Sequence, residues 1–307
     1  MYDKGYGSAF SQGIWNGIKT SFRRGSSLTR LIYINIGLFL CIKIINVLFL
    51  LTGQSVDLYT LLLEYLGVPA DPEYLLYRPW TVVTYMFTQF GFLHLLFNML
   101  WLYWFGSFFL EHFSEKELTG VYLLGGLSGA LLYVAAYNIF PFFEASRYYS
   151  WAIGASASVM AIVFSVCFYL PQNRIYIFLL GPVKLIHLAL FTAFIDILSI
   201  PTSNAGGHIA HLGGALFGFL FVFGVRHNRN FTGSVVSFFE KIGRLFAGKK
   251  NMRVKYKKQP SQMNDREYNA YRKQKDERIN AILDKISRSG YESLTREEKE
   301  ILFKSGK

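Results

Sequence analysis

The sequence predicts an all-α polytopic membrane protein: a bundle of six transmembrane helices followed by a small cytoplasmic helical tail. Three observations support this fold class. The chain has 307 residues, of which 52% are hydrophobic and only 17% are charged, a composition that is rare in soluble proteins. Its apolar residues gather in six long runs, and its positive charge lies outside these runs.

The six apolar runs approach the length of a transmembrane helix, which is about 20 apolar residues. They occupy residues 31–51, 94–110, 120–140, 152–170, 183–200 and 205–225. We therefore expect a multi-pass protein that stays in its membrane.

The charged residues divide the chain into three parts. Residues 1–30 contain five basic and one acidic residue (net +4), residues 31–225 contain six and nine (net −3), and residues 226–307 contain 21 and ten (net +11). Positive flanks place both termini in the cytoplasm, which only an even number of spans allows. We expect three domains at these limits: an amphipathic N-terminal segment, a membrane domain, and a basic cytoplasmic linker with a helical tail. The expected location is a bacterial inner (plasma) membrane.

Two segments outside the spans have an apolar character of their own. Before the first span, Phe10, Ile14, Ile18 and Phe22 recur every fourth residue, which is typical of an amphipathic helix on a membrane surface. The connection between the first two spans, residues 52–93, is rich in acidic and aromatic residues. We expect it to be half-buried in the outer leaflet.

The tail after the last span is predicted to contain two short helices. Gly290 is placed to end the first helix, and Thr295 and Glu298 have the spacing of a capping box at the start of the second. The basic charge suits a solvated appendage, with anionic lipid as the alternative partner. We expect no nucleic-acid partner, and no residue cluster in this tail is suited to chemistry.

Polar residues inside the apolar runs identify the candidate site, because such residues are costly in a bilayer and usually functional. With both termini inside, the second, fourth and sixth runs all enter from the outer face. At about 1.5 Å per residue, Ser156 lies roughly 6 Å and His211 roughly 9 Å below the start of its run. His94 and Asn98 occupy the first turns of the second run. Three sites that are separate in sequence are thus expected at one depth.

These residue types match the chemistry of acyl transfer. A serine hydroxyl becomes a good nucleophile when a neighbouring base takes its proton, and histidine suits that role near neutral pH. Ser156 and His211 supply this pair. His94 and Asn98, four residues apart on one helix face, offer N–H groups for an oxyanion alongside the backbone amide of Ser156.

Small residues would let the fourth and sixth helices approach closely enough for this pair to meet. Gly154 lies just before Ser156. Gly214 and Gly218 form a GxxxG pattern on the same helix face as His211.

Other interpretations stay open at this point. Small residues are ordinary packing devices, Ser156 could simply bond a carbonyl, and His211 could be a buried neutral bridge. His208 and His211 form an HxxH pattern that could bind zinc with a third residue, but no HExxH occurs and no acidic residue lies nearby in sequence, so we predict no metal and no cofactor. His208 and His211 lie at similar depths in the sixth run, so depth does not decide which of them is the base. The position of His211 on the same helix face as Gly214 and Gly218 favours His211. Asp196 could orient the histidine, although a polar partner for a helix end is the preferred interpretation.

Four segments together resemble the rhomboid family of intramembrane serine proteases: "GASA", "AHLGGALFG", "HLLFNMLWLYWFGSFFLE" and "RPWTVVTYMF". The resemblance covers about residues 31–225. It implies that Ser156 is the nucleophile and His211 the base of a Ser–His dyad, with His94 and Asn98 in the oxyanion hole. It also implies that Gly154 shapes the serine turn and that Arg78 and Trp80 belong to a membrane-embedded first loop.

Two positions depart from the family pattern. Ala157 replaces the glycine that commonly follows the serine, and Met160 stands where an aromatic residue often packs on the histidine. Neither change removes a catalytic group, so we expect effects on rate and specificity.

The predicted function is that of an intramembrane serine endopeptidase, which cleaves transmembrane segments of other membrane proteins near the outer face through an acyl-enzyme on Ser156. The substrate partners enter from the lipid bilayer, and those with helix-breaking residues are favoured because a helix hides its carbonyls. The alternatives are a non-catalytic relative that binds and escorts membrane proteins, and a transporter. Retention of Ser156 and His211 argues against the escort protein, and a polar cluster away from mid-depth argues against the transporter.

Overall fold

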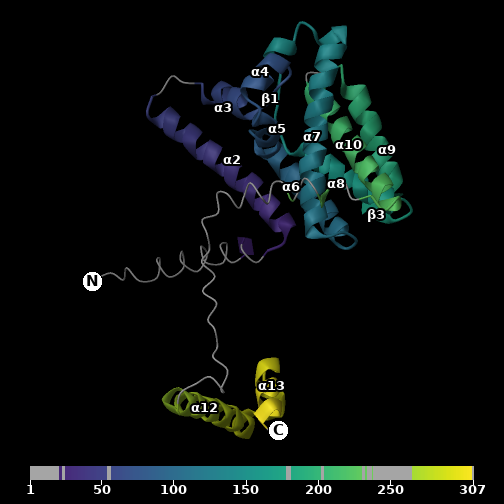
Figure 1. Cartoon of the computed structure of the whole chain (residues 1–307). Helices are drawn as coiled ribbons and strands as arrows, with labels where there is room; N and C mark the ends of the chain where they lie inside the picture. Colours follow the sequence, from purple (N-terminus) through teal and green to yellow (C-terminus); the bar gives the residue numbers. More distant parts are fainter. Residues whose placement is uncertain are drawn as a thin grey trace. The chain divides into compact units, whose positions relative to one another are not determined.

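The computed structural model describes residues 21–22, 25–53, 57–177, 181–201, 204–229, 232–233, 237 and 265–305 (Figure 1). The chain divides into two compact units, residues 1–246 and 247–307, and each is described by itself. The predicted amphipathic helix around Phe10, Ile14 and Ile18 lies outside the described residues. So does most of the predicted basic linker.

The prediction of a mostly helical membrane protein is confirmed. Among the described residues, four helices are long and apolar enough to cross a membrane: α2 (Ser27–Leu51), α6 (Phe92–Leu110), α7 (Glu115–Ile139) and α10 (Ala205–Arg226). The fourth and fifth apolar runs form shorter helices, α8 (Ser156–Tyr169) and α9 (Leu185–Ser199). At about 1.5 Å per residue, the 14 residues of α8 extend roughly 21 Å, which is less than the ~30 Å core of a bilayer.

The start of α8 corrects the predicted limits of the fourth run. Trp151–Ala152 forms strand β2, and the helix begins only at Ser156, after the turn at Gly154. The candidate nucleophile is therefore the first residue of its helix, whereas the sequence placed it a full turn inside.

The connection between α2 and α6 is structured along most of its length. It contains α3 (Leu58–Leu66), β1 (Val68–Pro69), α4 (Pro72–Tyr77), α5 (Thr81–Thr84) and the 3-10 helix η1 (Tyr85–Phe87). Strand β1 pairs antiparallel with β2, so that Val68 lies opposite Ala152 and Pro69 opposite Trp151. This pairing fastens the connection to the segment that leads into Ser156.

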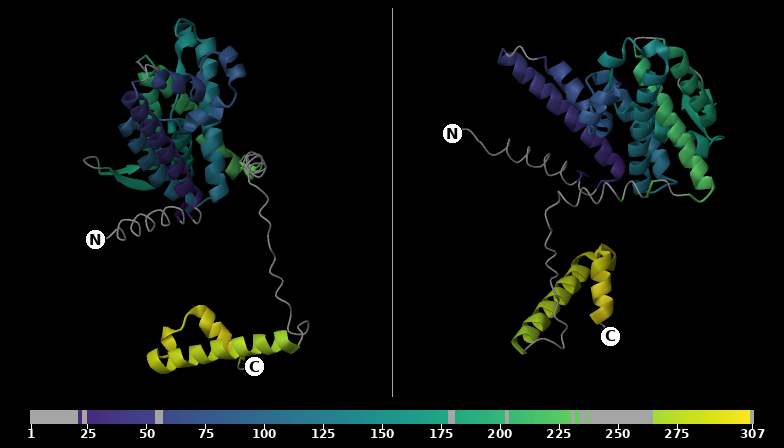
Figure 2. Two further views of the ribbon diagram at one scale, coloured as in Figure 1. Left: turned by 90° about the vertical axis from the view of Figure 1, so that its left-hand side faces the viewer. Right: turned by 45° about the horizontal axis from the view of Figure 1, so that its top comes forward.

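Two small sheets modify the predicted all-α class. One is the β1–β2 pair, and the other is the hairpin of β3 (Arg174–Ile177) and β4 (Gly181–Lys184) between α8 and α9. Figure 2 shows this hairpin extending away from the helices. Two 3-10 helices, η2 (Pro141–Phe143) and η3 (Arg147–Tyr149), lie between α7 and β2.

Local sequence signals fix where the long helices begin. Helix α7 follows a capping box, in which the Ser114 hydroxyl accepts from the Glu117 amide and the Glu117 carboxylate accepts from the Ser114 amide. The neighbouring Glu115 carboxylate accepts a hydrogen bond of 2.9 Å from the backbone N–H of Ser27 at the start of α2. Helix starts that are far apart in sequence are thus joined.

Helix α8 lies at the centre of the membrane unit. It packs against α6, α7, α9 and α10, and most of its residues are buried. Its contacts with α7 are made possible by glycines, since a Cβ at Gly125 would lie 2.2 Å from the Cβ of Ala161 and one at Gly129 would lie 2.6 Å from the Cβ of Ala157. Backbones approach this closely only where side chains are small.

The C-terminal unit is a helical hairpin of α12 (Asp265–Ser289), the 3-10 helix η5 (Tyr291–Ser293) and α13 (Arg296–Ser305). The predicted helix end is confirmed by Gly290, whose φ of 76° suits glycine. The predicted capping box is confirmed by reciprocal hydrogen bonds between Thr295 and Glu298. A hydrogen bond from the Lys285 ammonium, together with the capping bond, lowers the pKa of the Glu298 carboxyl to about 2.

Candidate active site

Ser156 is held at the end of a strained turn. Gly154 has a φ of 125°, a conformation that favours glycine, and its backbone N–H donates to the Tyr85 carbonyl at 2.9 Å. A Cβ at Gly154 would lie 2.9 Å from Cε1 of His94 and 3.7 Å from the Ser156 hydroxyl. The turn thus brings the half-buried serine next to the His94 ring.

The start of α8 gives Ser156 a second property. The first backbone N–H groups of a helix have no partner within the helix, and the helix dipole makes this end favourable for negative charge. Since α8 begins at Ser156, the backbone amide of Ser156 is one of these groups at the helix start. In the part of the chain that the structure describes, the Ser156 hydroxyl itself makes no hydrogen bond.

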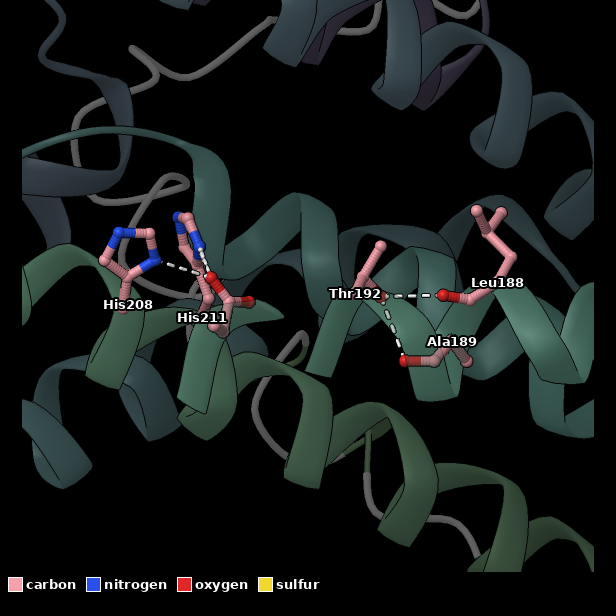
Figure 3. A network of polar contacts seen from close by, with 6 residues as sticks. Leu188, Ala189, Thr192, His208 and His211 are labelled. Atoms are coloured by element: carbon pink, nitrogen blue, oxygen red, sulfur yellow. Dashed lines mark hydrogen bonds and ion pairs between the residues drawn. The ribbon is translucent and has the colours of Figure 1, made fainter. Parts of the chain in front are cut away.

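His211 is oriented by a carboxylate from another helix. The His211 Nδ1 lies 2.9 Å from Oδ1 of Asp196, which is buried on α9. The same oxygen lies 2.7 Å from Nδ1 of His208. Figure 3 shows both rings turned toward this one carboxylate. With its Nδ1–H donated to Asp196, a neutral His211 has Nε2 free to accept a proton.

Asn98 belongs to a buried chain of amides. Its Nδ2 donates to the Gln89 side-chain oxygen at 2.9 Å, and the Gln89 amide donates in turn to Asn35 on α2 at 3.1 Å. Asn35 donates to the Tyr122 hydroxyl, which donates to the Met86 carbonyl. This chain fixes the Asn98 amide, as buried polar networks do when every member is satisfied.

Two cavities meet at the candidate residues. Ser156, His94 and His211 line both a cavity of about 300 Å³ and a second one of about 490 Å³. The smaller cavity is also lined by Asn98, Asp196 and Met160, and its remaining lining residues are mostly apolar: Phe97 and Trp101 of α6, and Phe191, Thr192 and Ile195 of α9. Residues from α6, α8 and α10 therefore face one space, although they are more than 50 positions apart in the sequence.

The remaining sequence-predicted residues support this arrangement from outside the cavities. A Cβ at Gly214 would lie 2.0 Å from the Ala157 carbonyl oxygen, and one at Gly218 would lie 2.3 Å from the Ala161 carbonyl oxygen, so α10 and α8 touch through their backbones. Arg78 donates to the Glu64 carbonyl, and Trp80 donates to the Tyr65 carbonyl. These last two bonds tie the segment before η1 to α3.

Sequence reasoning missed or undervalued two positioning residues. Asp196 was interpreted as a partner for a helix end, but its carboxylate contacts both histidines. Gln89 carried no recognised motif, although it lies only nine positions before Asn98 and is fully buried. A glutamine next to an apolar helix start is a weak signal that could have identified it.

Asp196, His208 and His211 are also the residues that could hold a metal ion, since one ligand atom from each lies within 4.8 Å of the others. The third ligand that the HxxH pattern lacked is therefore supplied by α9. The acidic residue is near in space, although not in sequence.

Comparison with known families agrees with the geometry. Residues 77–228 match the model of the rhomboid domain, and residues 263–304 match a family of unknown function, DUF6576. The chain is 30% identical over 144 residues to RHOMBOID-like protein 12, mitochondrial, of Arabidopsis thaliana, which covers 44% of this chain and 43% of that protein. It is 30% identical over 146 residues to the human presenilin-associated rhomboid-like protein, mitochondrial, which covers 44% of this chain and 35% of that protein.

These relatives correct one expectation. The chain aligns with less than half of their length, and both are mitochondrial by name. The expectation of a bacterial plasma membrane with cytoplasmic termini is therefore wrong, since these relatives point to a mitochondrial membrane. The charge pattern could not identify the membrane, because positive flanks indicate only which ends of the chain share a side. On the match of residues 77–228 and the similarity to these relatives, the chain belongs to the rhomboid family.

Proposed function

We propose that the protein is an intramembrane serine endopeptidase with Ser156 as nucleophile and His211 as general base. One observation carries this proposal: Ser156, His94 and His211, from three helices, line the same two cavities. The hydrogen bond from His211 to Asp196 supports it, because it leaves Nε2 as the proton acceptor.

The reaction follows from these positions. Nε2 of His211 takes the proton of the Ser156 hydroxyl while Oγ attacks the scissile carbonyl carbon, and Asp196 holds the imidazole in place. His94, Asn98 and the Ser156 amide donate to the resulting oxyanion. Collapse of this intermediate breaks the C–N bond, and the proton on His211 passes to the leaving amine. Water, deprotonated by His211, then hydrolyses the acyl-enzyme and frees Ser156.

The substrate we propose is a transmembrane segment of another protein. The smaller cavity lies between aromatic residues of α6 and α9, which suits apolar side chains that arrive from lipid. Because a helix hides its carbonyls in hydrogen bonds, segments with helix-breaking residues are favoured. We further propose that α8 and α9 complete six spans with the four longer helices, which leaves both ends on one side of the membrane. The names of the relatives favour a mitochondrial membrane.

A fluorophosphonate probe tests this function on the full chain in detergent. An activated serine attacks the phosphorus, so the wild type should be labelled and Ser156→Ala should not. His211→Ala should lose nearly all labelling. Ser158→Ala is the matched control, because Ser158 lies on the same helix, is fully buried and has no hydrogen-bond partner among the described residues. Folded wild-type protein that takes no label and cleaves no model transmembrane substrate would instead favour a non-catalytic binding protein.

A further inference from the structure

The Asp196 carboxylate lies between two imidazoles in an arrangement that a transition-metal ion can also use. Its Oδ1 is 2.7 Å from Nδ1 of His208 and 2.9 Å from Nδ1 of His211. His208 and His211 are one turn apart on α10, and Asp196 reaches them from α9. One carboxylate oxygen and two imidazole nitrogens are typical ligands of Zn²⁺ at a site that keeps one position open.

We propose that Asp196, His208 and His211 form a binding site for a divalent cation of the Zn²⁺ type, and that binding inhibits the proposed proteolysis. Ligand atoms bonded to one tetrahedral zinc are roughly 3.3 Å apart, given Zn–N and Zn–O bonds of about 2.0–2.1 Å. The two carboxylate–imidazole separations need to open by only a few tenths of an ångström from 2.7 and 2.9 Å. Both imidazoles are 21% exposed, which gives them room to turn and the ion a path to enter.

Inhibition follows from the histidine tautomer. When Nδ1 of a neutral His211 binds the cation, the remaining ring proton resides on Nε2. That nitrogen then cannot accept the proton of Ser156, and Asp196 no longer receives the hydrogen bond that orients the base. The cation therefore removes the general base without contacting Ser156. This consequence rests on the proposed function, whereas the binding site itself does not.

Binding is tested on the metal-free full chain in detergent, without reference to activity. Isothermal titration with Zn²⁺, and Co²⁺ as a visible-absorption probe, should show one bound ion per chain in both the wild type and Ser156→Ala. His208→Ala should weaken binding by more than about 10-fold, since a direct ligand contributes at least as much as its supporting residues do. His227→Ala is the control, because His227 directly follows the same helix and its ring Nδ1 lies 2.7 Å from the Phe223 carbonyl, away from Asp196. Equal affinity in His208→Ala and the wild type would overturn the site.

Inhibition is tested by labelling and by cleavage of a model transmembrane substrate. Zn²⁺ should inhibit the wild type and EDTA should restore it, while His208→Ala should stay active and require more than about 10-fold more Zn²⁺ for inhibition. If Ser156→Ala binds Zn²⁺ but the wild type never cleaves, the protease proposal fails and the metal site stands. If the wild type cleaves but binds no Zn²⁺, the metal site alone fails. If EDTA abolishes cleavage and Zn²⁺ restores it, the cation is catalytic and the inhibitory role is wrong.

Discussion

The Asp196 carboxylate contacts two histidines, His208 and His211, which differ in their position relative to the cavities. His211 lines both cavities, whereas His208 lines neither of them. The helix packing also favours His211, since Gly214, on the His211 face of α10, packs against the backbone of α8. His211 is therefore better placed than His208 for the proposed role of base, and His208 shares the carboxylate with it.

Asp196→Asn should lower kcat and leave KM nearly unchanged. The amide keeps the size of the side chain but loses the charge that stabilises a protonated His211 and selects its tautomer. We expect a loss of kcat of at least about 10-fold, and no larger than the roughly 10²–10⁴-fold that a general base contributes in full. Steady-state cleavage of a model substrate, with Tm measured beside it, checks this. An unchanged kcat would mean that Asp196 only closes a helix end.

Gln89→Ala should lower both stability and turnover. The change removes the hydrogen-bond acceptor of Asn98 Nδ2 and the donor to Asn35 Oδ1, at a cost of about 1–3 kcal/mol, and frees the Asn98 amide to leave the position proposed for oxyanion binding. Asn138→Ala is the control, since the Asn138 amide donates to the Ala70 and Val134 carbonyls and does not belong to the network of Gln89, Asn98 and Asn35. Thermal unfolding and kcat are measured for both. Equal losses of kcat in the two variants would show that Gln89 has no special relation to the site.

At the scale of elements, the short helix α8 determines the site. Glycines of α7 and α10 let α8 pack closely against both helices, and the late start of α8 leaves the segment from β2 to Gly154 to lead the chain to Ser156. The β1–β2 pair and the Gly154–Tyr85 bond hold that segment. The position of Ser156 among the helices is thus set by a loop and a helix start together.

Gly214→Ala should destabilise the protein and slow labelling of Ser156. The added Cβ would lie 2.0 Å from the Ala157 carbonyl oxygen, so α8 and α10 must move apart. Overpacking of this kind costs about 1–3 kcal/mol. Gly37→Ala is the matched control, because nothing lies within 4 Å of a Cβ at that position in α2. Tm and labelling rate are compared, and equal behaviour of the two variants would refute the backbone contact between the helices.

At the scale of the whole molecule, the helices of the membrane unit pack closely together except for α2, of which only the N-terminal part is buried. The buried residues of α2 all lie between Ser27 and Ile42, and its C-terminal part exposes apolar side chains such as Leu50 and Leu51. Exposed apolar side chains on this scale suit contact with lipid. The C-terminal unit has hydrogen bonds of its own, between Lys285 and Glu298 and between Thr295 and Glu298, and residues 263–304 match a separate family of unknown function.

Six spans predict a specific labelling pattern. Cysteines that replace His112, after α6, Tyr176, in the exposed hairpin between α8 and α9, and His227, after α10, should react with an impermeant maleimide from one side of the membrane. A cysteine that replaces Tyr149, between α7 and β2, should react from the other side. The background is the variant with Cys41→Ser and Cys167→Ala, since these are the chain's two cysteines. Labelling of His227→Cys and Tyr149→Cys from the same side would contradict the six-span arrangement.

The sequence by itself determined the helical membrane class, the order of the helices and four of the residues that line the smaller cavity: Ser156, His211, His94 and Asn98. These features are local: apolar runs mark helices, and polar residues within such runs are too costly to occur without a role. Only the tertiary structure decided that Asp196 contacts both histidines, that Gln89 holds Asn98, and that α8 begins at Ser156. The physical reason is that hydrogen bonds between helices depend on how the helices are rotated and set in depth, and packing of many side chains fixes these quantities together.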